Sequence, residues 1–248
     1  DTKYLHIDSS ASYMAGTAGS FEIGRKTKGK WNYSAGLTWF SPGAEFNDLG
    51  YLKQADVIKQ INKCRYMYNK SFWIFRRFYS FLKQSNQWDF GGRYLFSDVE
   101  LQNRFEFSNR WALEIHPGFQ TRKLDTRQLR GGEAMLFPSS WRIYWLMQTD
   151  YSRKIYSQFS VYYHEFPEIS AQYIQITPAI IFRPLNALRL YASCAYTYNI
   201  DPLQYVTQLD FRSEKRYLLG SIHQQNLEFE LKVDLSITPD MTIQYYGS

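Results

Sequence analysis

The residues best suited to chemistry are four histidines, because imidazole can bind a metal or transfer a proton. His6, His116, His164 and His223 lie far apart, with no His-Glu-x-x-His pattern and no second ligand two or four positions away. The sequence also has no Gly-x-Ser-x-Gly, no P-loop and no Gly-x-Gly-x-x-Gly. This spacing predicts no metal site, no cofactor and no nucleotide chemistry.

A hydroxyl and imidazole pair is of interest because barrel phospholipases and barrel proteases place Ser, His and acidic residues on the lipid or outer face of their strands. Ser108 and His116 fall on neighbouring predicted strands, both toward the polar side, and no acid is placed to orient the histidine. The two cysteines, Cys64 and Cys194, lie far apart without metal-ligand spacing and are expected to be small apolar fillers. We therefore expect no catalysis and keep a barrel hydrolase only as the least favoured alternative.

Composition narrows the class of protein before any element is placed. The chain has 248 residues, of which 44% are hydrophobic, 21% charged and 19% aromatic, which suits one folded domain and excludes disorder. No run of eighteen apolar residues is present, so no transmembrane helix is expected. The formal charge is +6, but 29 Lys and Arg are scattered among 23 Asp and Glu, so no nucleic-acid partner is expected.

Apolar and polar residues alternate with a period of two along much of the chain, and this alternation predicts the strands on which any site must lie. In one segment an apolar row that includes Val99 and Leu101 alternates with a charged row that includes Glu100 and Arg104. The segment 227–237 repeats this pattern, with Leu and Phe on one side and Glu, Lys and Asp on the other. Successive side chains of a strand point to opposite faces, so these segments are predicted to be strands with one apolar and one charged face.

About thirteen such segments are expected, many of ten or more residues. Strands that cross a bilayer at a tilt need about nine to eleven residues, whereas soluble strands cluster near five or six. The fold class predicted is therefore all-β, an antiparallel up-and-down transmembrane β-barrel. The predicted strands are 3–14, 18–26, 30–41, 56–68, 71–83, 94–108, 110–121, 141–151, 155–164, 172–183, 188–199, 226–237 and 241–247.

Connections give an independent indication, because very short turns alternate with longer polar links. The expected links are 42–55, 84–93, 122–140, 165–171 and 200–225. Outer-membrane barrels have this asymmetry, with short periplasmic turns and longer external loops. Aromatic residues beside the short turns suit an interfacial girdle: Phe72, Trp73, Phe107, Trp111, Tyr151, Tyr156, Phe182 and Tyr245.

A water-soluble barrel or sandwich remains the alternative to a membrane barrel. In that fold the same apolar rows would point inward as a packed core, and the charged rows would meet solvent. A period of two residues does not distinguish inside from outside. Strand length, loop asymmetry and aromatic placement together favour the membrane barrel.

Two segments resemble a known family. They are Ser-Pro-Gly-Ala-Glu-Phe-Asn-Asp-Leu-Gly-Tyr at 41–51 and Ser-Ile-Thr-Pro-Asp-Met at 236–241, the latter leading to Gln-Tyr-Tyr-Gly at 244–247. They are similar to the C-terminal barrel of Bacteroidota outer-membrane proteins of uncharacterised function. Those proteins carry an N-terminal β-sandwich like a family-nine carbohydrate-binding module. The strand and loop spacing is compatible along nearly the whole chain.

The resemblance implies location and architecture but no activity. It implies an outer-membrane protein in which more chain precedes Asp1 and further strands follow Ser248. Residues 1–248 would then be one barrel domain, incomplete at both ends. An odd strand count agrees, because closed single-chain bacterial barrels normally have an even number of strands.

Candidate binding residues come from the external loops and from the charged face. Glu45, Asn47 and Asp48 form either a structural corner or a cluster of hard oxygen donors for a ligand or cation. Loop aromatics are able to stack on sugar rings or simply to pack: Trp88, Phe90, Phe137 and Tyr205. Charged residues expected to face the lumen, with mixed sign that argues against a strongly selective pore, are Glu100, Arg104, Glu106, Glu114, Arg142, Asp150, Glu228, Glu230, Lys232 and Asp234.

These observations predict a barrel component of the bacterial outer membrane that binds or passes a ligand, in its most concrete form a glycan, without catalysis. Its expected partners are the lipid bilayer, glycans and other envelope proteins. The alternative function is a structural anchor or partner subunit of a larger cell-envelope complex.

Overall fold

The computed structural model describes residues 15–45, 54–212, 214–238 and 240–248, and these form an all-β structure with one short 3-10 helix, η1 (Pro167–Ile169). The expected strand 3–14 lies outside the described residues. Among the residues that are described, no helix has the length and apolar character needed to cross a membrane.

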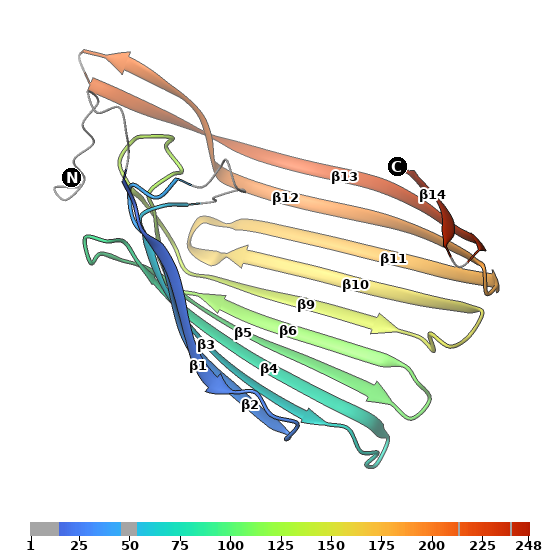
Figure 1. The fold of residues 1–248 in the computed structure, drawn as a ribbon. Helices are drawn as coiled ribbons and strands as arrows, with labels where there is room; N and C mark the ends of the chain where they lie inside the picture. Colours follow the sequence, from blue (N-terminus) through green and yellow to red (C-terminus); the bar gives the residue numbers. More distant parts are fainter. Residues whose placement is uncertain (1–14, 46–53, 213, 239) are drawn as a thin grey trace. The chain divides into compact units, whose positions relative to one another are not determined.

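Antiparallel neighbours in chain order build one large sheet (Figure 1). Its strands are β1 (Ala18–Arg25), β2 (Trp31–Phe40), β3 (Val57–Tyr68), β4 (Phe75–Trp88), β5 (Tyr94–Phe107), β6 (Ala112–Gln120), β9 (Ser140–Gln148), β10 (Ile155–Phe166), β11 (Ala171–Leu185), β12 (Leu188–Phe211), β13 (Glu214–Thr238) and β14 (Met241–Gly247). A separate ribbon pairs β7 (Lys123–Asp125) with β8 (Met135–Phe137).

The order of the large sheet runs from β1 to β14, and no pairing between described residues joins these two ends. The predicted all-β fold and antiparallel neighbour order are therefore confirmed, while closure into a barrel is not shown. Each strand of this sheet pairs with the next one along the sequence, with the β7 and β8 ribbon inserted between β6 and β9. Several connections are tight turns, whereas the connections 41–56 and 121–139 are long.

The chain divides into two compact units, which we describe one at a time. Unit 1 holds the described parts of 1–66, 81–100 and 119–139. Here the register sets Phe21 of β1 opposite Leu37 of β2, and Leu37 opposite Gln60 of β3. Opposed residues share a face, so this face of unit 1 is mostly apolar and amide-bearing, with Arg25 opposite Tyr33 at the end of β1 as its one charged residue among these paired positions. On the other face Glu22 bonds Lys63, with a Nζ to Oε2 distance of 2.9 Å.

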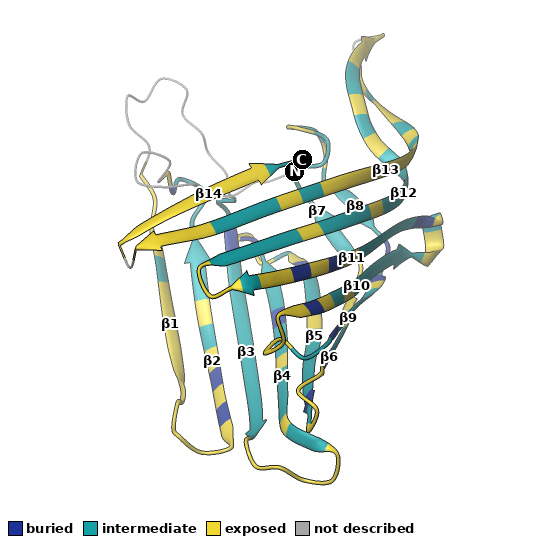
Figure 2. Ribbon diagram, turned by 90° about the vertical axis from the view of Figure 1, so that its right-hand side faces the viewer, coloured by how far each residue is buried: buried dark blue, intermediate teal, exposed yellow. Residues whose placement is uncertain are grey.

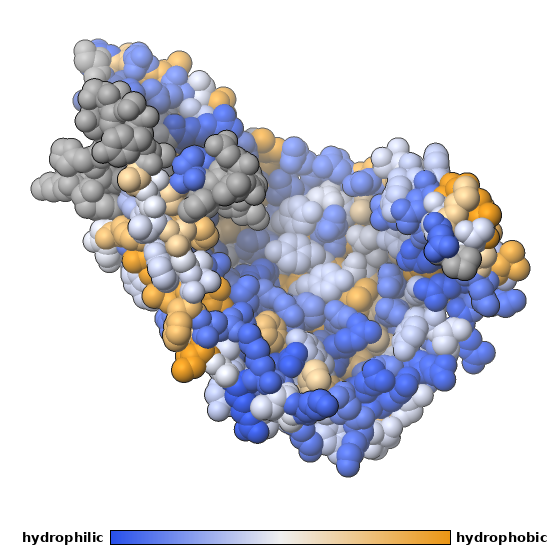
Figure 3. All heavy atoms as spheres, in the orientation of Figure 1, coloured by the Kyte–Doolittle hydropathy of each residue, from blue (hydrophilic) through white to orange (hydrophobic). Residues whose placement is uncertain are grey.

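Unit 2 holds 67–80, 101–118 and 140–248. The register sets Cys194 of β12 opposite Phe229 of β13, and Leu235 of β13 opposite Ile243 of β14. This uncharged face is exposed, with Phe229 62% and Ile243 50% accessible (Figure 2). Figure 3 also shows hydrophobic residues gathered around β14. The apolar rows of β12 to β14 therefore form no sealed interior within unit 2.

Three predicted boundaries were wrong for identifiable reasons. The predicted strand 71–83 is β4, which starts at Phe75 because the preceding turn is longer, and which continues to Trp88 through polar residues. The predicted link 122–140 contains β7 and β8. The predicted link 200–225 is a continuation of β12 and β13, whose alternation is hidden by register shifts between Asp201 and Thr207.

One residue of the expected aromatic girdle was also misplaced. Tyr156 is only 7% accessible, and Arg183 Nη2 donates a hydrogen bond of 3.0 Å to its hydroxyl. It lies opposite Ile181, which is fully buried, and so belongs to packing on the charged face. Six of the other aromatics are exposed, Trp73 most of all at 85%: Phe72, Trp73, Trp111, Tyr151, Phe182 and Tyr245.

Candidate binding site on the charged face

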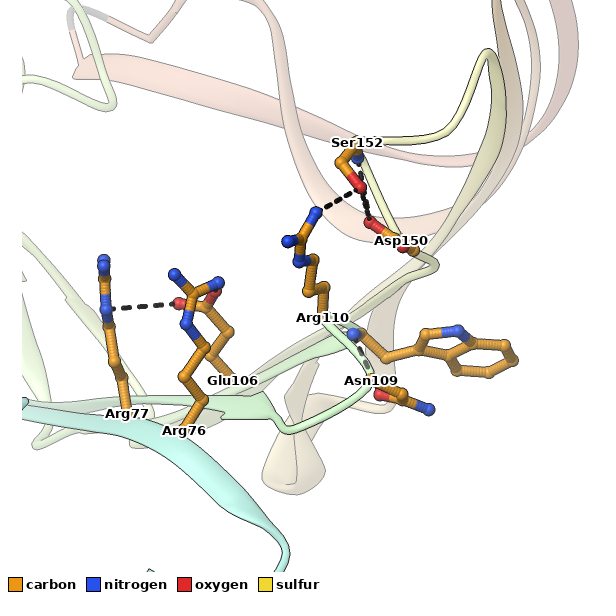
Figure 4. Close-up of polar contacts among 8 residues, drawn as sticks. Arg76, Arg77, Glu106, Asn109, Arg110, Asp150 and Ser152 are labelled. Carbon is orange, nitrogen blue, oxygen red and sulfur yellow. Dashed lines mark hydrogen bonds and ion pairs between the residues drawn. The ribbon is translucent and has the colours of Figure 1, made fainter. Parts of the chain in front are cut away.

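The most buried carboxylate of the predicted charged row lies in unit 2, where β4 and β5 approach their tight turns. The Glu106 side chain is 8% accessible, and its Oε1 accepts a hydrogen bond of 3.1 Å from Arg76 Nη1. Arg77 Nε lies 3.8 Å from the other oxygen (Figure 4). Two guanidinium groups thus compensate one desolvated carboxylate, which is the condition under which a buried charge is tolerated.

A cavity of about 340 Å³ opens beside this carboxylate, within unit 2. Arg77 lines this cavity, with more than half of its side chain exposed and its Nε 3.8 Å from Glu106 Oε2. Guanidinium donors next to aromatic rings suit a ligand that has an oxyanion and an apolar face. The lining residues are Met67, Asn69, Arg77, Phe78, Tyr79, Arg104 and Glu106.

Arg104 and His116 share a second carboxylate on the same face. Arg104 Nη1 bonds Glu114 Oε1, and the other oxygen of Glu114 lies 3.4 Å from His116 Nε2. The expectation that no acid accompanies His116 was therefore wrong, because the register of neighbouring strands was not known. Ser108, considered as its nucleophile, donates instead to the Ile74 carbonyl oxygen at 3.1 Å. Glu114 therefore lies between two basic side chains, and the Ser108 hydroxyl is bonded to a backbone carbonyl.

A chain of hydrogen bonds joins two tight turns of unit 2 (Figure 4). Arg110 Nη1 donates to Ser152 Oγ at 2.7 Å, and Ser152 Oγ donates to Asp150 Oδ1 at 2.6 Å. The Ser152 hydroxyl and then its backbone N–H lower the pKa of Asp150 below its ordinary value. Asp150 was expected in a strand, but it lies in the turn after β9, where it organises the turn.

Three of the remaining charged candidates, Glu230, Lys232 and Asp234, form ion pairs along or across strands. Arg189 Nη1 lies 3.0 Å from Asp234 Oδ2, and Gln244 Nε2 donates to the other oxygen at 3.3 Å. Glu230 and Lys232 pair at 2.6 Å along β13. Glu228, Glu230, Lys232 and Asp234 alternate with the apolar row of β13, as predicted. Arg142 packs over Gly118, and Glu100 is half-buried in β5.

The described loop candidates lie on different elements. Glu45 is exposed, while Asn47 and Asp48 lie outside the described residues. Trp88 ends β4 and packs edge-on against Tyr94, and Phe90 N–H donates to Asp56 Oδ1 at 3.0 Å. Phe137 ends β8. Tyr205 was expected in a loop, but it lies within β12 because that strand continues past the predicted boundary.

An amide network on the face of unit 1 that carries Leu37 was not predicted from the sequence. Asn62 Nδ2 donates to Gln84 Oε1 at 2.8 Å, and Asn86 Nδ2 donates to Gln60 Oε1 at 2.9 Å. Ser97 Oγ bonds Asn86 Oδ1. Gln84 and Asn86 had been assigned to a loop, so their pairing with β3 was not foreseen. The network consists of Gln60, Asn62, Gln84, Asn86 and Ser97.

Across the residues that the structure describes, no group of three His, Cys, Asp or Glu side chains comes together to hold a metal ion. A family model described as "Domain of unknown function (DUF5916)" matches residues 1–246, so the chain belongs to this family. No curated protein and no solved structure matches it.

Proposed function

We propose that this DUF5916 chain forms part of the wall of an outer-membrane β-barrel, where it binds or passes a ligand along its charged face and performs no chemistry itself. The observation that carries the proposal is the two-sided character of β12 to β14. Arg189 and Asp234 pair on one face, while Phe229 and Ile243 are exposed on the other. A large exposed apolar face needs an apolar environment, and hydrocarbon supplies one.

Strand length supports a membrane wall. A strand crosses the hydrocarbon core with about nine to eleven residues, and β10 and β11 have 12 and 15. The 24 residues of β12 and 25 of β13 exceed this length. In our proposal the part of this hairpin before the register shifts crosses the bilayer, and the part beyond them extends outside it.

Aromatic residues at the tight turns of unit 2 give a second support. Trp73 lies in the turn between β3 and β4 and is 85% accessible, and Trp111 and Tyr151 flank the next two turns. An indole exposed to this degree gains little in water. At a membrane interface its ring meets the acyl boundary and its N–H meets the headgroups.

The cavity beside Glu106 is the place on the charged face that we propose for a ligand. Arg77 and Arg104 supply donors for an oxyanion, and Tyr79 supplies a ring against which a saccharide could lie. The glycan version depends on the resemblance to Bacteroidota barrels joined to a carbohydrate-binding-like domain. That resemblance stays a proposal, to be tested by reading the complete open reading frame for such a domain.

The proposal is tested by extraction and by electrophoresis. The chain should require detergent for extraction, remain β-rich in detergent by circular dichroism, and migrate differently in SDS before and after boiling. A chain that purifies as a monomer in plain buffer, with the same spectrum and no change of mobility on boiling, would contradict a membrane wall.

A structural anchor or partner subunit is the second candidate, and packing on the charged face favours it. Ile181 and Tyr156 are buried there, with Arg183 against the Tyr156 ring at 5.1 Å. A filled interior would carry no current. Planar-bilayer recordings decide between the two functions, because an open conductance supports ligand passage, and a silent chain that copurifies with other envelope proteins supports the anchor.

A further inference from the structure

The amide-bearing face of unit 1 has a chemistry that does not suit direct exposure to lipid. The registers place Gln60 opposite Leu37, and Asn62 opposite Ala35. Hydrogen bonds from these amides bring Gln84 and Asn86 of β4 onto the same face. Within unit 1 a neutral polar network therefore occupies the face on which Phe21 and Leu37 also lie. This inference rests on the proposed membrane location.

The network satisfies only part of its own hydrogen-bonding capacity. A primary amide has two N–H donors and two acceptor lone pairs. Among the described residues, Gln60 and Gln84 use their oxygens as acceptors, and Asn62 uses its nitrogen as a donor. The donors Gln60 Nε2 and Gln84 Nε2 and the acceptor Asn62 Oδ1 remain for another partner. Acyl chains offer no donors or acceptors, so polar groups at membrane depth pair with protein.

We propose that this amide face is the contact surface between two copies of this chain in the membrane. The partner surface that meets the network must be uncharged, because the network consists of neutral side chains that cannot neutralise a charge. It must also offer donors and acceptors together, as amides do. A two-fold axis brings the same patch against itself, so the open donors of one copy face the open acceptor of the other. The donors and acceptors of the network are therefore complementary to those of a second copy.

The apolar residues around the network suit the same contact. Leu37, Leu82 and Val99 are exposed by 40%, 42% and 38%, respectively, and lie on the strands that carry the amides. Side chains of this size pack between two sheets without adding polar groups that need partners. The interface would therefore have a hydrogen-bonded centre with an aliphatic surround. It would remove both kinds of surface from the lipid.

The two native cysteines provide a test with an internal control. Cys64 lies on the amide face, opposite Tyr33, and Cys194 lies on the apolar face of unit 2, opposite Phe229. The detergent-purified chain, reconstituted into phosphatidylcholine vesicles, is treated with a short bis-maleimide. We expect a covalent dimer from the wild-type chain and from Cys194→Ser, and none from Cys64→Ser. Dimers through Cys194 alone, or none in any variant, would overturn the assignment.

A second measurement separates an interface from amides that merely bond one another. The double variant Gln60→Leu/Asn86→Leu should lower the dimer fraction at least tenfold in sedimentation equilibrium, while circular dichroism stays unchanged. The matched control is Gln175→Leu, which removes a hydrogen bond to Thr197 on the charged face of unit 2 and should leave the dimer fraction unchanged. If the amides face lipid, the wild-type chain is monomeric and the leucine variants are more stable.

The outcomes for the membrane location and for the interface are distinguishable. A chain that needs no detergent refutes the proposed function. A chain that needs detergent, shows heat-dependent mobility and remains a monomer at every protein-to-lipid ratio refutes the interface alone. A dimer that forms equally in the double leucine variant also refutes it, since the contact would then lie elsewhere.

Discussion

The two units differ in the side chains on the face opposite their ion pairs. In unit 2 the face of β12 to β14 is built mainly from leucine, isoleucine, phenylalanine and tyrosine, with Leu227 60% and Tyr245 57% exposed. In unit 1 the face of β3 to β5 includes amides that bond one another across strands. Both faces follow the same period of two residues, yet only the first is suited to contact hydrocarbon along its whole length.

The charged faces, by contrast, are alike in the two units. Glu22 bonds Lys63 and Lys26 in unit 1, and Glu106 bonds Arg76 and Arg77 in unit 2. In each case one carboxylate lies between two cations. The difference between the units is therefore confined to the side that we propose to face the membrane. In our proposal, the side chains on this face, and not the strand pattern, distinguish contact with lipid from contact with protein.

The largest expected effect comes from placing a charge on the apolar face of unit 2. Leu231 is 46% exposed, and Leu231→Arg should destabilise the chain by about 2–4 kcal/mol, because arginine at the middle of a bilayer is poorly solvated. The measurement is urea unfolding in phospholipid vesicles. The matched control is Thr197→Arg on the charged face, for which we expect a much smaller change. Equal losses for the two variants would remove the distinction between the faces.

A smaller effect is expected from the charged face itself. Glu106→Gln removes the negative charge that lies between Arg76 and Arg77, and should lower the free energy of unfolding by about 1–2 kcal/mol. This value is lower than for a fully buried pair, because the Arg76 and Arg77 side chains are 38% and 54% exposed and solvent screens the interaction. Glu230→Gln, whose pair with Lys232 is about one-third exposed on both sides, should change it by less than about 1 kcal/mol. If Glu230→Gln has the larger effect, burial does not determine the strength of these pairs.

The sequence predicted most of the strands and both alternating faces, because a period of two residues is a local property. It did not predict the amide network, since Gln84 and Asn86 interrupt the apolar pattern and were assigned to a loop. It also did not predict that Glu114 lies beside His116, or that Glu106 lies beside Arg76 and Arg77. Such contacts depend on the packing and register of neighbouring strands, which no single segment encodes.

The smallest expected effect on stability concerns the hydrogen bonds between the tight turns of unit 2. The pKa of Asp150 is lowered in the folded chain by the hydroxyl and then the backbone N–H of Ser152. Its stabilising contribution is therefore present above the ordinary pKa of the carboxyl group and is lost as the pH falls through the lowered value. Asp150→Asn should be slightly less stable than wild type at pH 7, and this difference should disappear under acid conditions.

Urea midpoints measured at a series of pH values check this expectation. Ser152→Ala removes the hydroxyl donor and should shift the loss of stability toward higher pH, because the pKa of Asp150 then returns toward its ordinary value. The difference in urea midpoint between Asp150→Asn and wild type could instead stay constant down to low pH. That result would show that the stability depends on the shape of the side chain and not on its charge.

The central claim is that the apolar row of β13 contacts hydrocarbon while its neighbours do not. Single cysteines at positions 227 to 235, in a Cys64→Ser/Cys194→Ser background, can be spin-labelled in phospholipid vesicles. Accessibility to oxygen should peak at Leu227, Phe229, Leu231, Val233 and Leu235, and accessibility to a water-soluble nickel chelate should peak at the residues between them. Nickel accessibility that is highest at the Leu and Phe positions, or equal along the strand, would contradict the account.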